Sequence, residues 1–467
     1  MKKTYRLTIG LTAVLCGVSL LATACGQGGT TSSDPASTPE TTTTTATSTT
    51  TTTTGGDTTG TQETSATTGT TSSATGTKTE TATGISATTK TSTTKKPTTT
   101  KPTKQEDALM DYTKYNIDCY IEPIWKGNVV YNESVMFVPD PVTGEMTSAP
   151  LMYKPDKILS VRSSDLTKVY KEGADFVVTE DGRIQLTEKT RMPFWAYDDY
   201  FMKTYESFGL PSKLAKGRYY KYAAGDTFLK TQICVTYTHS DKWNGPVPKY
   251  AGNVLKNTVS KLKNKQPLRI VYNGDSITVG AESSKWNNVA PYVPIWSEMV
   301  TQELRKVYDA PLLETNTAVG GMDSAWGLAN VEENINKYTP TLVVLGFGMN
   351  DGTQGVRPAH FKKNIQDTID KVRAKHPDCE FILVSTTMPN PDVSGPWTQF
   401  QADYQEELED IAEDYEGVAV AKMTDMHLHL LTLKRYWDMT GNNINHPNDF
   451  LARVYAQVIA QMLVEEL

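Results

Sequence analysis

Four short motifs in the second half of the chain carry groups that could do chemistry together. "GDSIT" contains Ser276, "NTAVGGMDS" contains Gly321, "GFGMND" contains Asn350 and "GNNINHPNDF" contains His446. A serine hydroxyl can attack a carbonyl carbon when an adjacent base takes its proton, and a neutral imidazole is such a base. A backbone N–H beside paired glycines and a side-chain amide are donors of the kind that stabilise a developing negative oxygen. Each motif also has a purely structural explanation, since serine and asparagine cap helices and glycine permits turns.

These groups can meet only if the fold brings the motifs to one place, and the pattern after Pro267 predicts that it does. The expected strands span 268–275, 312–318, 341–348, 380–386 and 417–423, and the expected helices span 292–308, 324–338, 359–375, 398–415 and 449 onward. Apolar strands that alternate with helices predict a doubly wound, mainly parallel five-stranded sheet. Ligands of such sheets bind at the carboxyl ends of the strands, where three of the motifs lie.

Taken in this order, the motifs resemble those of the SGNH (GDSL-type) hydrolase family over residues 267–467. The resemblance implies a flavodoxin-like α/β fold and a carboxylic ester hydrolase that works through an acyl-serine intermediate without a cofactor. It makes Ser276 the nucleophile and His446 the general base. The oxyanion hole would then consist of the N–H groups of Ser276 and Gly321 and the side-chain amide of Asn350.

The residue three positions before His446 departs from the family pattern, which has aspartate there, because this chain has Asn443. The carboxylate normally fixes the imidazole tautomer and stabilises the imidazolium. Three alternatives follow: a Ser–His dyad oriented by Asn443 or a backbone carbonyl, a carboxylate recruited from Asp438 or Asp425, or a non-catalytic binding protein. We favour the dyad. It predicts that Ser276→Ala and His446→Ala abolish ester hydrolysis, whereas Asn443→Ala keeps substantial activity.

Residues 108–248 have a different character, with short β-rich runs between turn signals. Asp181-Gly182 lies between two alternating segments and predicts a hairpin, and Ile233, Val235 and Tyr237 alternate with less apolar residues as in a half-buried strand. Regularly spaced strands predict an all-β sandwich, jelly-roll-like in type. Its aromatic stretch "MPFWAYDDYFMKTYESF" is interpreted as a seam against the next domain or, alternatively, as a sugar-binding face. A connecting helix is expected within residues 249–266.

The N-terminus predicts export. Residues 1–24 combine a basic start with an apolar run, and "LLATAC" resembles a bacterial lipobox that would place a lipid anchor on Cys25. Residues 25–107 are mostly Thr, Ser, Gly, Pro and Lys, with too few large apolar side chains to offset the entropy of ordering, so we expect a disordered stalk. The expected location is the extracellular face of a bacterial cell membrane, with the membrane bound through the anchor.

Composition restricts the partners and cofactors. The net charge of −7 does not favour a nucleic-acid partner. Cys119, Cys234 and Cys379 have no zinc-ligand spacing; Cys119 and Cys234 could form a disulfide, and buried free thiols are the alternative. His427 and His429, two residues apart, are interpreted as packing residues at a strand end and not as metal ligands.

Three tryptophans follow the expected strand ends or their loops and could bind sugar rings: Trp286, Trp326 and Trp397. With the expected export, stalk and β-sandwich, they resemble features of two-domain carbohydrate acetyl esterases, which implies an acetylated polysaccharide or oligosaccharide substrate. The alternatives are an esterase acting on envelope polymers or lipids, and a surface carbohydrate-binding protein. Trp296, on a helical period, is expected in the core.

Overall fold

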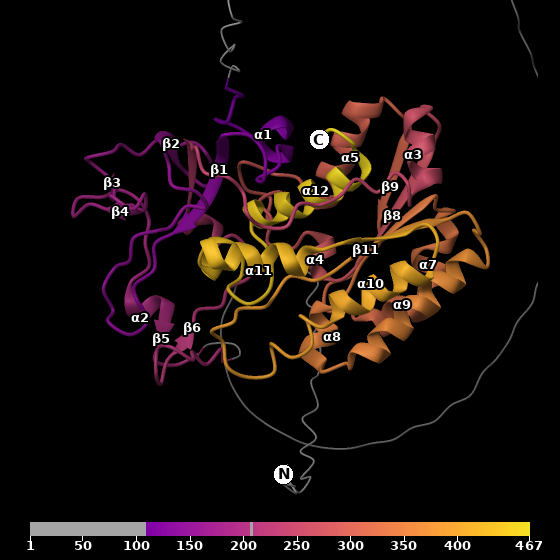
Figure 1. Cartoon of the computed structure of the whole chain (residues 1–467). Helices are drawn as coiled ribbons and strands as arrows, with labels where there is room; N and C mark the ends of the chain where they lie inside the picture. Colours follow the sequence, from indigo (N-terminus) through magenta and orange to yellow (C-terminus); the bar gives the residue numbers. More distant parts are fainter. Residues whose placement is uncertain (1–108, 206–208) are drawn as a thin grey trace, which may run out of the picture. The chain divides into compact units, whose positions relative to one another are not determined.

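The computed structural model describes residues 109–205 and 209–467, so Cys25, the predicted signal peptide and the predicted stalk up to residue 107 lie outside the described residues. The described chain has two parts, the β region, residues 109–248, and the α/β region, residues 249–467 (Figure 1). The α/β region is built on a five-stranded sheet with the order β12-β11-β10-β8-β9. Its strands are β8 (Leu268–Gly274), β9 (Leu312–Asn316), β10 (Leu342–Gly346), β11 (Glu380–Val384) and β12 (Val418–Ala421). All four pairings are parallel, which confirms the predicted sheet.

Helices cover both faces of this sheet because both faces of its strands are apolar. Ile270 and Val344 face one buried cluster, and their neighbours Val271 and Val343 face another. The first cluster includes residues of α3 (Lys256–Lys263), α5 (Trp296–Tyr308), α11 (Met423–Leu433) and α12 (Asp449–Leu463). The second includes residues of α7 (Val331–Asn334), α9 (Pro358–Arg373) and α10 (Tyr404–Asp414), with α6 (Ser324–Ala329) against it. The single helix expected over 324–338 is therefore divided into α6, α7 and a 3₁₀ turn, Asn336–Tyr338.

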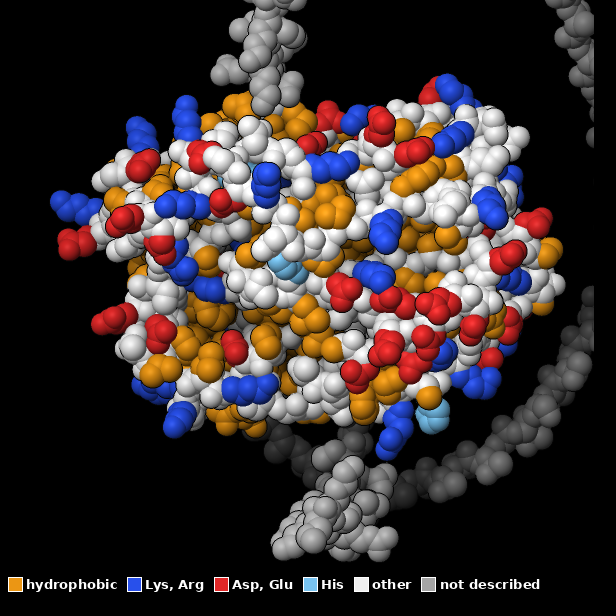
Figure 2. Space-filling view, in the orientation of Figure 1, with side chains coloured by type: hydrophobic (Ala, Val, Ile, Leu, Met, Phe, Trp, Pro, Cys, Tyr) orange, Lys and Arg blue, Asp and Glu red, His pale blue; other side chains and the backbone are white. Residues whose placement is uncertain are grey.

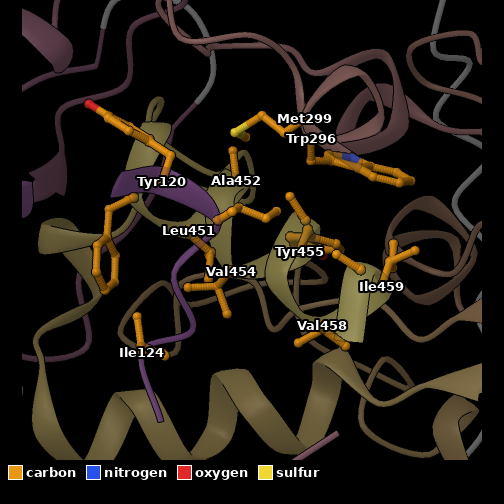
Figure 3. Close-up of a cluster of buried hydrophobic side chains, with 14 of the residues drawn as sticks. Tyr120, Ile124, Trp296, Met299, Leu451, Ala452, Val454, Tyr455, Val458 and Ile459 are labelled. Carbon is orange, nitrogen blue, oxygen red and sulfur yellow. The ribbon is translucent and has the colours of Figure 1, made fainter. Parts of the chain in front are cut away.

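The C-terminal helix α12 begins at Asp449, as predicted, but it is buried along its whole length and does not have an exposed polar face. On one side Tyr455 of α12 stacks on Trp296 of α5, with ring centroids 5.9 Å apart, and the other side receives Tyr120 and Ile124 from the β region (Figure 3). Its polar side chains reach the β region as well, since Gln457 Nε2 donates to the carbonyls of Tyr120 and Glu122. A helix surrounded by protein in this way joins the two parts into one core.

Helix α11 was not expected, and it corrects the interpretation of the two neighbouring histidines. His427 and His429 lie on this helix and not at the end of a strand. Burial lowers the pKa of His427 to about 3, and its Nδ1 accepts a hydrogen bond from the Met388 N–H at 3.0 Å. His429 packs edge-on against Trp243. Within the described part of the chain, no three His, Cys, Asp or Glu side chains are grouped to bind a metal ion.

The β region contains a three-stranded antiparallel sheet, β1-β7-β2, and two two-stranded sheets among its described residues. Its strands are β1 (Val129–Met136), β2 (Lys157–Ser163), β3 (Phe176–Val178), β4 (Ile184–Leu186), β5 (Phe201–Met202), β6 (Tyr219–Tyr220) and β7 (Gln232–Thr238). Strands β3 and β4 form the hairpin predicted at Asp181-Gly182. Strand β7 is central and not half-buried, since Gln232 and Thr236 are buried too. Gln232 donates to the Thr440 carbonyl of the α/β region at 2.8 Å.

Part of the aromatic stretch, around Tyr200 and Phe201, packs at the predicted seam, whereas Phe194 and Tyr205 are exposed and residues 206–208 lie outside the described residues. Tyr200 and Phe201 are fully buried, and the Tyr200 hydroxyl donates to Asn443 Oδ1 at 2.9 Å. Cys119, Cys234 and Cys379 are free, so the disulfide considered between the first two is absent. None of the helices in the described ranges has the length and apolar character of a transmembrane segment. On the face drawn in Figure 2, acidic side chains gather over α10.

Candidate active site

The loop after β8 places Ser276 at the start of helix α4 (Ser276–Val279). Gly274 is required there because a Cβ at this position would lie 2.2 Å from the Gly346 carbonyl oxygen of neighbouring β10. Asp275 caps the helix, and its Oδ1 accepts a hydrogen bond from the Ile277 N–H at 2.9 Å. Ser276 is 8% exposed, at the carboxyl edge of the sheet. The strand therefore leads directly into a serine that is almost completely buried.

His446 lies against this hydroxyl although 170 residues separate the two in sequence, with His446 Nε2 2.8 Å from Ser276 Oγ. The loop that carries the imidazole is held by its own side chains, because Asn442 Oδ1 accepts hydrogen bonds from the backbone N–H groups of Ile444 and His446. Asn448 then caps α12 by accepting from the Leu451 N–H at 3.0 Å. The hydrogen bonds of Asn442 and Asn448 thus fix the position of His446 in the site.

The glycine turn predicted to supply an oxyanion donor lies beside Ser276, and the predicted asparagine donor binds the residue that follows this turn. A Cβ on Gly320 would be 3.6 Å from Ser276 Cβ, and Gly321 has a φ of +81° with open space where a side chain would be. Asn350, in α8 (Met349–Gln354), donates through Nδ2 to the Met322 carbonyl at 2.9 Å. The structure therefore brings all four motifs to one edge of the sheet. A hydroxyl, an imidazole and several N–H groups can perform acyl transfer there.

None of the three residues considered as orienters of His446 contacts its ring. Asn443 is turned away, with Oδ1 accepting from Tyr200 and Nδ2 donating to the Lys221 carbonyl at 2.9 Å. Asp438 binds Arg435 and accepts from the Met136 N–H at 2.8 Å. Asp425 is exposed on α11. The expectation that Asn443, Asp438 or Asp425 orients the imidazole is corrected: each has another place in the fold.

The acid that faces the other side of the imidazole is Glu282, with Oε1 3.6 Å from His446 Nδ1. Glu282 is 5% exposed and has a φ of +69°, a conformation that costs energy for a residue with a side chain. Sequence reasoning missed it. Its signal is an acid six residues after Ser276 in "GAESS", but spacing alone does not reveal that this loop turns back toward residue 446.

The three tryptophans expected to bind sugar rings differ in exposure. Trp286, in the loop after α4, is 54% exposed. Tyr292, in the same loop and not expected, is equally exposed at 54%. Trp326 and Trp397 are half-buried and pack against two separate apolar clusters. Trp296 is buried, as expected.

A pH-dependent loss of stability is expected from the helix cap beside Ser276. Burial raises the pKa of Asp275 to about 7 from an ordinary value of 3.8. Between these two values the folded state holds a proton that the unfolded chain has released, so the free energy of unfolding falls as pH rises. A difference of about three pH units corresponds to roughly 4 kcal/mol at most. Asp275→Asn keeps the cap without titrating, so urea unfolding at pH 4.5 and 7.5 should show a smaller fall than in the wild type.

Asp351 and Asp449, whose pKa values burial raises to about 6, still titrate in that variant and leave a residual slope. An equal fall in the variant and the wild type would contradict the assignment to Asp275.

Comparisons with known proteins find the same segment. Residues 273–453 match the model of the GDSL-like Lipase/Acylhydrolase family. Esterase TesA of Pseudomonas aeruginosa is 29% identical over 125 residues, which cover 27% of this chain and 56% of TesA. A two-domain esterase (CEX) active on acetylated mannans, co-crystallised with mannopentaose, has a TM-score of 0.37 and 22% identity over 47% of this chain and 55% of its own. Axe2, an acetylxylan esterase from Geobacillus stearothermophilus, has a TM-score of 0.36 and 14% identity over 42% of this chain and 94% of its own.

The matched part of this chain thus spans 56% of TesA and 55% of CEX.

Proposed function

Residues 273–453 are a domain of the GDSL-like Lipase/Acylhydrolase family, and from this premise we propose that the chain is a cell-surface serine esterase that removes O-acetyl groups from polysaccharides. The observation that carries the hydrolase assignment is the 2.8 Å contact between Ser276 Oγ and His446 Nε2, beside the glycine turn. The other parts of the proposal have separate supports, given below.

The reaction uses the groups in the order in which they meet the ester. Ser276 Oγ attacks the acetyl carbonyl carbon while His446 Nε2 takes its proton. The N–H groups of Ser276 and Gly321 and the amide of Asn350 hold the oxyanion. His446 returns the proton to the sugar oxygen as the C–O bond breaks, which leaves acetyl-Ser276. Water, deprotonated by His446, then releases acetate and restores the serine.

The substrate class is supported by aromatic residues on the loop that follows the nucleophile in sequence. Trp286 and Tyr292 present exposed rings on the loop that follows Ser276, and aromatic rings of this kind pack on the apolar faces of sugars. The cell-surface location is supported by the sequence "LLATAC" before a long Thr/Ser-rich segment, which would hold the enzyme away from a membrane anchor at Cys25. Both supports favour an extended, polar substrate outside the cell.

Acetate release tests this function directly. We expect the purified chain to release acetate from acetylated xylan, mannan or pectin, and to hydrolyse short-chain chromogenic esters much faster than long-chain ones. Trp286→Ala should raise KM for the polymer by up to about tenfold and leave the small ester nearly unaffected, because one stacked ring contributes roughly 0.5–1.5 kcal/mol. Cleavage of long-chain esters without release of acetate from any of the polymers would overturn the polysaccharide assignment.

A further inference from the structure

Glu282 occupies the place, beside the imidazole, that the missing aspartate would have taken. We propose that Glu282 is the positioning residue for His446, and that a segment of the β region, residues 219–226, here called the strap, holds it there. This inference rests on the proposed function and deepens it, because it makes the β region part of the hydrolytic machinery. Glu282 acts through His446 and does not touch the ester.

The first step of the argument is the tautomer of His446. Its Nε2 can accept a proton from Ser276 only if Nδ1 carries the ring's own proton. That Nδ1 is buried and has no hydrogen-bond partner within the described residues. The nearest acid is Glu282, whose Oε1 lies 3.6 Å away. Contacts of this kind are often long in unliganded enzymes and shorten when substrate binds.

The second step is the set of contacts that hold the carboxylate. Glu282 Oε2 accepts a hydrogen bond from the Gly225 N–H at 2.7 Å, so the strap binds the oxygen that does not face the imidazole. On the other side Gly441 packs so closely that a Cβ there would lie 2.4 Å from Glu282 Cβ. A buried charge needs a partner. The imidazolium that forms during catalysis would supply it.

The third step explains the asparagine at position 443. Asn443 Nδ2 donates to the Lys221 carbonyl of the strap, and its Oδ1 accepts from Tyr200. The Lys221 N–H in turn donates to the Tyr200 carbonyl at 2.8 Å. Asn443 stands where the family has an aspartate, and its hydrogen bond holds the strap in place. The strap in turn holds Glu282, the acid that replaces that aspartate. The β region is thus linked to His446 through the strap, which binds Asn443 at Lys221 and Glu282 at Gly225.

Removing the carboxylate without straining the backbone tests the first part of the proposal. Glu282→Gly suits the φ of +69° and leaves space at the imidazole. We expect kcat on a short-chain acetyl ester to fall by about 10²–10⁴-fold with KM within threefold, as when the acid of a triad is lost. Formate should restore part of kcat in Glu282→Gly and none in Glu282→Gln, whose side chain fills the space. A residue with only a structural role would show no such rescue.

Matched variants separate this effect from burial or backbone strain. Glu303→Gln changes another buried glutamate, on α5, and should leave kcat unchanged. Gly225→Ala and Gly217→Ala each place a side chain at a positive φ, +84° and +72°, but only the first displaces the N–H that binds Glu282. We expect Gly225→Ala to lower kcat at least tenfold and Gly217→Ala to leave it within twofold.

Each outcome decides one part. If the wild type is active and the Glu282 variants have a similar kcat, the positioning role is overturned while the proposed function stands. The same follows if formate does not restore activity to Glu282→Gly. Equal effects of Gly225→Ala and Gly217→Ala overturn the role of the strap. A wild type that hydrolyses no acetyl ester overturns the proposed function, and this inference falls with it.

Discussion

Ser276→Ala should lower kcat by about a millionfold, the loss seen when a serine nucleophile is removed from a serine hydrolase. The variant lacks the hydroxyl oxygen that lies 2.8 Å from His446 Nε2 and can attack from that position. Because the change deletes one nearly buried atom at the start of a four-residue helix, the midpoint of thermal unfolding should move by no more than a few degrees. Acetate release and the pre-steady-state burst of a chromogenic acetyl ester measure the loss.

His446→Ala should cause a loss of the same order, and the double variant should be hardly worse than either single one, since the two residues act as a unit. His360→Ala, an exposed histidine on α9, serves as the control and should keep full activity. Asn443→Ala is expected to keep far more activity than Ser276→Ala, as the sequence predicted, but less than the wild type, because its side chain binds the strap that holds Glu282 and does not touch the imidazole. More than about 1% of wild-type kcat in Ser276→Ala would refute the nucleophile assignment.

The parallel sheet and the meeting of the four motifs were predictable because they depend on short-range patterns. Residues such as Val343 and Val344 form continuous apolar strands, and the carboxyl ends of parallel strands must share one edge. The place of His446 on a loop before the last helix was predictable from the helical pattern, since α12 begins three residues later at Asp449, whereas its role came from the resemblance to the SGNH family. Each of these inferences uses only residues that are neighbours in sequence or on one sheet.

The features that sequence reasoning missed depend on how distant segments pack. Helix α12 looks amphipathic alone, but the β region covers the face that carries Arg453 and Gln457. Glu282 cannot be distinguished from a surface acid until Gly225 and His446 are placed on its two sides. The side chain of Asn443 likewise faces away from His446 because it donates to the carbonyl of Lys221, which is far away in sequence. The missing information was the contact between the β and α/β regions, which hydrophobic periodicity does not encode.

That contact leads to the largest expected effect on stability: Lys434→Met should lower the free energy of unfolding by about 3–5 kcal/mol, the cost of leaving one member of a buried ion pair alone. Lys434 of the α/β region and Glu133 of β1 form a salt bridge in which both side chains are 0% exposed. Lys434 Nζ also donates to the Ser134 carbonyl at 2.9 Å, and Glu133 Oε2 accepts from the Tyr237 hydroxyl at 2.6 Å. Urea unfolding measures the change.

The Lys434→Met/Glu133→Gln double variant should recover part of that loss, because it leaves no charge of this pair buried without a partner and the introduced amide can still accept hydrogen bonds. Lys363→Met, which breaks an exposed pair with Asp367 on α9, is the control and should cost less than about 1 kcal/mol. If both Lys434→Met and the control were nearly neutral, the buried ion pair would contribute little to the free energy of unfolding and the prediction would be wrong. A large loss for Lys434→Met would instead show that this pair stabilises the contact between β1 and the α/β region, where Asn448 Nδ2 also donates to Ser134 Oγ at 2.7 Å.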